Sequence, residues 1–88
     1  MSPEPFQVAW TSTARRSLTR LPEKVVAAAV EFVYGALANG PYRVGKPLRR
    51  ELEGMHSARR GDFRIVYRIT DVVTILAIDH RADVYRPR

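Results

Sequence analysis

Apolar side chains recur along this chain at two different spacings, and each spacing predicts a different kind of element. Ala14, Leu18 and Leu21 lie at positions i, i+4 and i+7, which is the period of one face of a helix. Thr11 or Thr13 precedes them and can cap the helix, because a threonine hydroxyl accepts a hydrogen bond from an unpaired N–H of the first turn. The pattern predicts a short amphipathic first helix.

A second helix is predicted from Pro22 to about Ala38. Its apolar positions follow i, i+4, i+7 and i+11, and they are Val26, Val30, Val33 and Leu37. Pro22 suits the first turn of a helix, where its missing N–H removes no hydrogen bond. Asn39, Gly40 and Pro41 should end the helix, with Gly40 in the left-handed conformation common at helix C-termini. The two helices are expected to form a hairpin.

Short apolar runs rich in β-branched and aromatic residues predict the strands. These strands are expected at Gln7–Trp10, Met55–Arg59, Phe63–Ile69 and Val72–Asp79, with a basic loop from Tyr42 to Glu53. The last two runs are long and should pair as an antiparallel hairpin in the centre of the sheet. The order β-α-α-β-β-β predicts an α+β fold, with the helices segregated on one face and residues 1–88 forming a single domain.

The strand predicted at Phe63–Ile69 carries arginines within its apolar run. Arg64 and Arg68 recur at period two and project to one face, whereas the aromatic and aliphatic residues project to the other. A buried charge without a partner is costly. We therefore expect one face of the sheet to be polar and to bind anions, and the other to be covered by the helices.

Positive charge is concentrated in the second half of the chain. The net charge is +6, of which residues 43–88 contribute +5, and ten of their eleven basic residues are arginine. Arginine offers phosphate a planar fork of donors. This pattern favours a nucleic-acid partner, the alternative being a solvated basic surface. The absence of cysteine, of a long apolar run and of a signal-peptide pattern predicts a cytoplasmic protein with no membrane contact.

The candidate chemistry depends on a few residues of this basic half. No glycine-rich phosphate loop, Ser-His-Asp spacing or metal-ligand set is present, so no metal or cofactor is predicted. Arg64, Arg81, His80 and Tyr85 suit cleavage of RNA, in which the ribose 2′-OH attacks the adjacent phosphate. Arg64 and Arg81 would neutralise the developing charge, and His80, Tyr85 or a carboxylate would transfer protons. Asp79 is expected to pair with an arginine rather than act as a base.

Four segments resemble the RelE/ParE superfamily, the toxins of bacterial type II toxin–antitoxin modules. They are residues 13–22, 45–54, 59–67 (RRGDFRIVY) and 80–85 (HRADVY), and the resemblance is to the RelE branch. It implies a microbial-RNase-like fold and an endoribonuclease that cleaves mRNA in the ribosomal A site, stopping translation and growth. It also implies a RelB-like antitoxin that covers the basic surface, and operator DNA bound only by the toxin–antitoxin complex.

The same resemblance assigns individual roles. Arg64 matches the arginine that stabilises the transition state, Tyr85 matches the C-terminal tyrosine, and His80 and Arg81 lie in the C-terminal catalytic segment. RNA or ribosome binding is expected at Lys46, Arg49, Arg50, Arg59, Arg60 and Arg68. The lysines that precede the central strand in RelE toxins have no counterpart in residues 55–59, which leaves the general base unassigned. The alternatives are a ParE-like inhibitor of DNA gyrase and a catalytically degenerate, antitoxin-binding corepressor.

Overall fold

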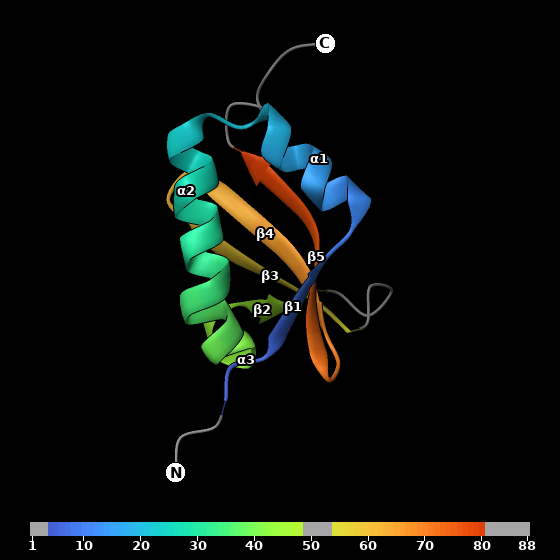
Figure 1. Ribbon diagram of the computed structural model, residues 1–88. Helices are drawn as coiled ribbons and strands as arrows, with labels where there is room; N and C mark the ends of the chain where they lie inside the picture. Colours follow the sequence, from blue (N-terminus) through green and yellow to red (C-terminus); the bar gives the residue numbers. More distant parts are fainter. Residues whose placement is uncertain (1–3, 49–53, 81–88) are drawn as a thin grey trace.

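The computed structural model describes residues 4–48 and 54–80, which build one mixed sheet with helices on one side (Figure 1). The strands are β1 (Gln7–Trp10), β2 (Lys46–Pro47), β3 (Met55–Arg60), β4 (Phe63–Ile69) and β5 (Val72–His80), in the spatial order β1-β5-β4-β3-β2. The β4–β5 hairpin lies inside the sheet, as predicted. β1 pairs in parallel with β5, and all other neighbours are antiparallel. The predicted α+β class is confirmed.

The first helix, α1 (Ser12–Arg20), begins where the sequence predicts. Thr11 is its N-cap, and the Thr11 hydroxyl accepts a hydrogen bond of 3.1 Å from the backbone N–H of Ala14. This bond satisfies one of the N–H groups that the first turn leaves unpaired. The alternative cap, Thr13, lies inside the helix. The helix ends before Pro22, whose ring cannot continue it.

The second helix differs in part from its prediction. It runs as α2 (Glu23–Phe32) and continues as a π-helical turn, η1 (Val33–Leu37). Its inner face is formed by Ala29, Phe32, Val33 and Leu37, all buried, so the predicted stripe is rotated around the helix axis. The predicted left-handed conformation of Gly40 is wrong, because its φ is −151°. The Asn39 side chain instead donates to the backbone oxygen of Gly35 at 2.7 Å near the helix end.

Two short elements replace part of the predicted basic loop. Pro41–Val44 forms the one-turn helix α3, and Lys46–Pro47 forms the edge strand β2 against β3. Gly45 joins them at a point where the chain passes close to β3. A Cβ atom at Gly45 would lie 2.6 Å from the backbone oxygen of Ser57 and would also overlap the Tyr67 hydroxyl. Only glycine fits at this contact.

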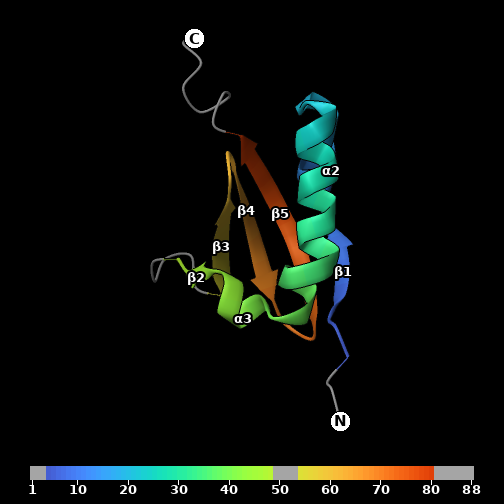
Figure 2. The same ribbon diagram turned by 90° about the vertical axis from the view of Figure 1, so that its left-hand side faces the viewer.

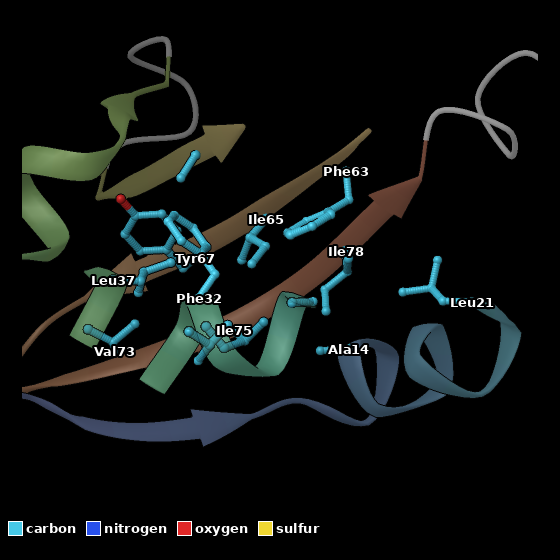
Figure 3. Close-up of a cluster of buried hydrophobic side chains, with 13 residues drawn as sticks. Ala14, Leu21, Phe32, Leu37, Phe63, Ile65, Tyr67, Val73, Ile75 and Ile78 are labelled. Carbon is cyan, nitrogen blue, oxygen red and sulfur yellow. The ribbon is translucent and has the colours of Figure 1, made fainter. Parts of the chain in front are cut away.

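The hydrophobic core lies between the sheet and the helices. In Figure 2, α2 lies along one side of the sheet, and Figure 3 shows the buried side chains between them. The fully buried residues include Val33, Leu37, Ile65, Tyr67 and Ile75. In β4 the buried residues alternate with Arg64, Val66 and Arg68. We call the two sides of the sheet the helix-covered face and the arginine face.

A β-bulge at Leu76 interrupts the alternation of β5. Val66 pairs with Ala77, whereas the next residue, Tyr67, pairs with Ile75, which leaves Leu76 as an extra residue. A bulge of this kind shifts the following side chains to the other face of the sheet. Ile75 and Ile78 therefore both lie in the core, although unbroken alternation would separate them. Past the bulge, Asp79 pairs with Arg64, and His80 pairs with Phe63.

Candidate functional site

The arginine face gathers basic side chains from three neighbouring strands. Arg59 of β3 lies directly opposite Arg64 of β4 in the ladder, and Arg68 lies on the same side farther along β4. Lys46 of β2 pairs with Ser57, which in turn pairs with Val66, so Lys46 belongs to this face as well. All four basic side chains are on exposed residues. The register therefore brings together the predicted RNA-binding residues Lys46, Arg59 and Arg68 and the predicted catalytic Arg64.

Arg64 occupies the middle of this face and contacts one carboxylate. The Arg64 Nη2 atom lies 3.5 Å from the Oδ2 atom of Asp79, and the two side chains are 47% and 45% exposed. The prediction that Asp79 pairs with an arginine is confirmed. An exposed ion pair of this kind contributes less than about 1 kcal/mol to folding. A guanidinium also has five N–H donors, so Arg64 keeps donors for a phosphate while it contacts Asp79.

Arg60 and His80 lie away from this cluster. The Arg60 guanidinium carbon lies 5.4 Å above the ring centroid of Phe32, a residue of α2, which places Arg60 against the helices. His80 pairs with Phe63, a buried residue of the helix-covered face. Because paired residues project to the same face, His80 lies opposite the arginine face. The structure therefore does not bring Arg60 or His80 together with Arg64.

Four predicted residues fall outside the described part of the chain. They are the catalytic candidates Arg81 and Tyr85 and the binding candidates Arg49 and Arg50. Their roles stay predictions from the sequence. The described site is thus the part of the predicted site that β2, β3, β4 and β5 carry.

Tyr67 and His56 form an aromatic cluster on the helix-covered face. The buried Tyr67 hydroxyl donates to the backbone oxygen of Pro41 at 2.7 Å, and burial raises the pKa of Tyr67 to about 12. His56 stacks on Tyr67 with 5.7 Å between ring centroids, and Tyr42 meets His56 edge-on at 5.9 Å. The buried His56 Nδ1 atom has no hydrogen-bond partner among the described residues. These rings hold α3 against the sheet, and Tyr67 is a core residue.

The described residues offer no obvious metal site. Residues 4–48 and 54–80 contain no group of three or more His, Cys, Asp or Glu side chains that could hold an ion. In the same residues no helix is both long and apolar enough to cross a bilayer. The chemistry available on the arginine face is that of guanidinium groups, one ammonium group and one carboxylate.

Comparisons with known proteins agree on one family. The family described as "ParE toxin of type II toxin-antitoxin system, parDE" matches residues 8–85. Toxin RelG of Mycobacterium tuberculosis is 58% identical over 85 residues, which cover 93% of this chain and 98% of the relative. Toxin RelE of the same organism is 59% identical over 85 residues, which cover 93% of this chain and 88% of the relative.

A solved structure supports the same grouping. The chain is similar to a chain in the crystal structure of the toxin–antitoxin complex RelBE2 from Mycobacterium tuberculosis, with a TM-score of 0.85 and 56% sequence identity. The match covers 90% of this chain and 94% of that chain. Both the sequence and the fold therefore match these relatives over nearly their whole length.

Proposed function

We propose that this chain, which belongs to the ParE toxin family of type II toxin–antitoxin systems, is a RelE-type toxin that cleaves mRNA on the ribosome, since relatives named toxin RelG and toxin RelE are 58% and 59% identical to it. Cleavage within translated codons would stop translation and arrest growth. The near 60% identity to proteins named toxin RelG and toxin RelE favours the ribonuclease over the gyrase inhibitor. An enzyme that acts on ribosomes works in the cytoplasm, in line with the location expected from the sequence.

The observation that carries this proposal is the position of Arg64. It lies in the middle of the central strand β4, half-exposed, with Arg59 beside it and with Lys46 and Arg68 on the same face. Such a cluster can neutralise several phosphates of a single RNA strand. Fixed donors aimed at developing charge are commonly the largest contribution to catalysis. These observations support the proposal that Arg64 binds the phosphate that reacts.

The proposed reaction needs neither a metal nor a protein nucleophile. The ribose 2′-oxygen attacks its own 3′-phosphate, the bond from phosphorus to the 5′-oxygen breaks, and the products are a 2′,3′-cyclic phosphate and a 5′-hydroxyl. Arg64 and Arg81 neutralise the charge that builds on the phosphate oxygens. Tyr85, His80 or a carboxylate are the proton-transfer candidates that the sequence supplies, although His80 lies on the helix-covered face.

The proposed protein partner is a RelB-like antitoxin. The similar RelBE2 structure is described as a toxin–antitoxin complex. The cationic residues Lys46, Arg59, Arg64 and Arg68 would attract an acidic segment that folds on binding and masks the site. The complex, rather than the toxin alone, would bind operator DNA.

Primer extension on mRNA from cells that briefly express the chain without antitoxin tests this function. We expect new cuts within translated codons, which disappear when translation is blocked and in the Arg64→Ala variant. Arg16→Ala is the matched control, since Arg16 is an exposed arginine on α1, and it should cut like the parent. Growth arrest with intact mRNA and DNA-damage signalling would instead identify a gyrase inhibitor. If the cells show no growth arrest and the mRNA shows no cuts, the chain is a degenerate, antitoxin-binding protein.

A further inference from the structure

The β-bulge at Leu76 places a titratable side chain opposite Arg64. If β5 alternated without interruption, Ile78 would lie opposite Arg64, and Asp79 would share the helix-covered face with Ile75. The extra residue reverses this arrangement, so that Asp79 pairs directly with Arg64. Bulges occur often next to active sites, where they redirect a side chain. Here the redirected side chain is a carboxylate.

Thr11 holds this bulge in place. Its backbone N–H donates to the backbone oxygen of Ile75 at 3.1 Å. Its hydroxyl lies 3.1 Å from the backbone oxygens of both Ile75 and Leu76, to which it donates, while it accepts from Ala14 as the cap of α1. The bulge is therefore fixed by the same residue that starts the first helix, and the position of Asp79 is built into the fold.

Other candidate bases in the described residues lie in less suitable places. His56 is stacked on Tyr67, and His80 pairs with Phe63, both on the helix-covered face. Asp62 and Asp71 lie in the exposed turns at the ends of β4. Asp79 combines two properties that a base needs here, because it contacts Arg64 and remains 45% exposed to solvent.

We propose that Asp79 is the general base of the cleavage reaction. This inference rests on the proposed ribonuclease function. It assigns the general base, for which the sequence offers no counterpart of the lysines that precede the central strand in RelE toxins. One oxygen of the Asp79 carboxylate takes the proton of the 2′-OH as the 2′-oxygen forms its bond to phosphorus. The bond to the 5′-oxygen breaks, and that oxygen takes a proton from water. Arg64 binds the same phosphate, so the base and the charge-neutralising group act on adjacent atoms.

The distance between the two groups suits this division of roles. A strong charge-assisted hydrogen bond joins its atoms at about 2.7–2.9 Å, whereas the Arg64–Asp79 contact is 3.5 Å. The carboxylate is thus held near the guanidinium without both of its oxygens being occupied. The ion pair positions Asp79, and the incoming ribose hydroxyl can reach a carboxylate oxygen.

Three substitutions at Asp79 separate a base from a positioning residue. An asparagine at this position would still accept a hydrogen bond from Arg64 but could not take a proton, so Asp79→Asn should lower single-turnover cleavage on programmed ribosomes about 10²–10⁴-fold. Asp79→Ala should lower it at least as much, and Asp79→Glu should restore part of the rate. Asp71→Asn is the control, because it removes an exposed carboxylate in the turn after β4, and its rate should not change.

Binding provides a readout that moves in the opposite direction. A single-stranded 2′-O-methyl RNA cannot be cleaved, because its nucleophile is blocked. Asp79→Asn removes a negative charge from a cationic surface, so this RNA should bind about two- to fivefold more tightly, the size of one exposed charge interaction. Tighter binding combined with slower cleavage is the result expected of a base. Unchanged thermal unfolding would show that the variant is folded.

Several results would overturn the inference. If Asp79→Asn cleaves like the parent while Asp79→Ala does not, Asp79 only positions Arg64. If both variants cleave as fast as the parent or faster, Asp79 merely screens the arginines. In these cases Arg64→Ala would still be inactive, and the proposed function would stand without this base. A parent protein that does not cut programmed mRNA would instead contradict the function itself.

Discussion

The two faces of one sheet differ in almost every physical property, although the same strands build both. On the helix-covered face, Ile65, Tyr67 and Ile75 are completely buried. On the arginine face, Arg64 and Arg68 alternate with them along β4 and are exposed. These three residues of the first face are enclosed by the core, whereas the arginines of the second face are exposed to solvent. The packed face makes the sheet rigid, and rigidity keeps the charged groups of the other face in register.

This division separates stability from chemistry. Substitutions on the helix-covered face should lower the free energy of unfolding, since they create cavities or leave buried polar groups unpaired. Substitutions on the arginine face should alter RNA binding and cleavage with little effect on unfolding. Neighbouring residues of one strand can therefore be compared in pairs.

The largest stability effect is expected from Ile65→Ala. Ile65 is 0% exposed, and a cavity at such a site lowers the free energy of unfolding by about 2–5 kcal/mol. Val66, one residue later, lies partly buried on the arginine face, so Val66→Ala should lower the free energy of unfolding by about 1 kcal/mol or less. Urea unfolding of the two purified variants measures both values. Equal losses would show that the two faces are packed alike.

A smaller effect depends on pH and belongs to Tyr67. Burial raises the Tyr67 pKa from 10.0 to about 12, so the folded state favours the neutral phenol. The full free energy of unfolding is therefore retained below pH 10. As the pH rises from 10 to 12, it falls by about 2–3 kcal/mol, because the Tyr67 phenol ionises in the unfolded chain before it ionises in the folded one. Tyr67→Phe should lack this loss, and at neutral pH it should cost about 1–3 kcal/mol because the Pro41 carbonyl loses its donor. Unfolding curves at several pH values test this, with the exposed Tyr42→Phe as control.

The smallest effects should separate the adjacent arginines 59 and 60. Arg59→Ala should weaken binding of a single-stranded 2′-O-methyl RNA and reduce the slope of log K against log salt by about 0.7. Arg60→Ala should leave that slope unchanged and lower the free energy of unfolding by about 0.5–1 kcal/mol, through its contact with Phe32. Measuring RNA binding by both variants at several salt concentrations tests whether only Arg59 contacts the RNA backbone. An equal change of slope would restore Arg60 to the RNA-binding set that the sequence predicts.

The sequence predicts the regular elements well and their long-range pairing poorly. β4 begins and ends where the period-two pattern places it, and β3 and β5 each extend one residue beyond their predicted ends. A two-residue edge strand such as β2, which contains a proline, leaves no periodic signal. The parallel pairing of β1 with β5 joins residues more than sixty positions apart, and no local pattern encodes it.

The candidate site shows the same limit at the level of single residues. Alternation alone assigns Arg64 and Arg68 to one face, and this assignment is confirmed. Alternation fails after Leu76, where the bulge exchanges the faces of Asp79 and His80. The bulge depends on hydrogen bonds from Thr11, a residue far away in the sequence, so the local pattern of β5 could not reveal it.

The most direct test of the account uses ribosomes programmed with an mRNA that carries a single 2′-deoxynucleotide at the mapped cut site. We expect the cut at this position to disappear, since the attacking hydroxyl is missing, while the all-ribose message yields a 2′,3′-cyclic phosphate end. Cleavage at the deoxy position at the parent rate would contradict it. The nucleophile would then be water or a protein group, and the arginine face would need a different role.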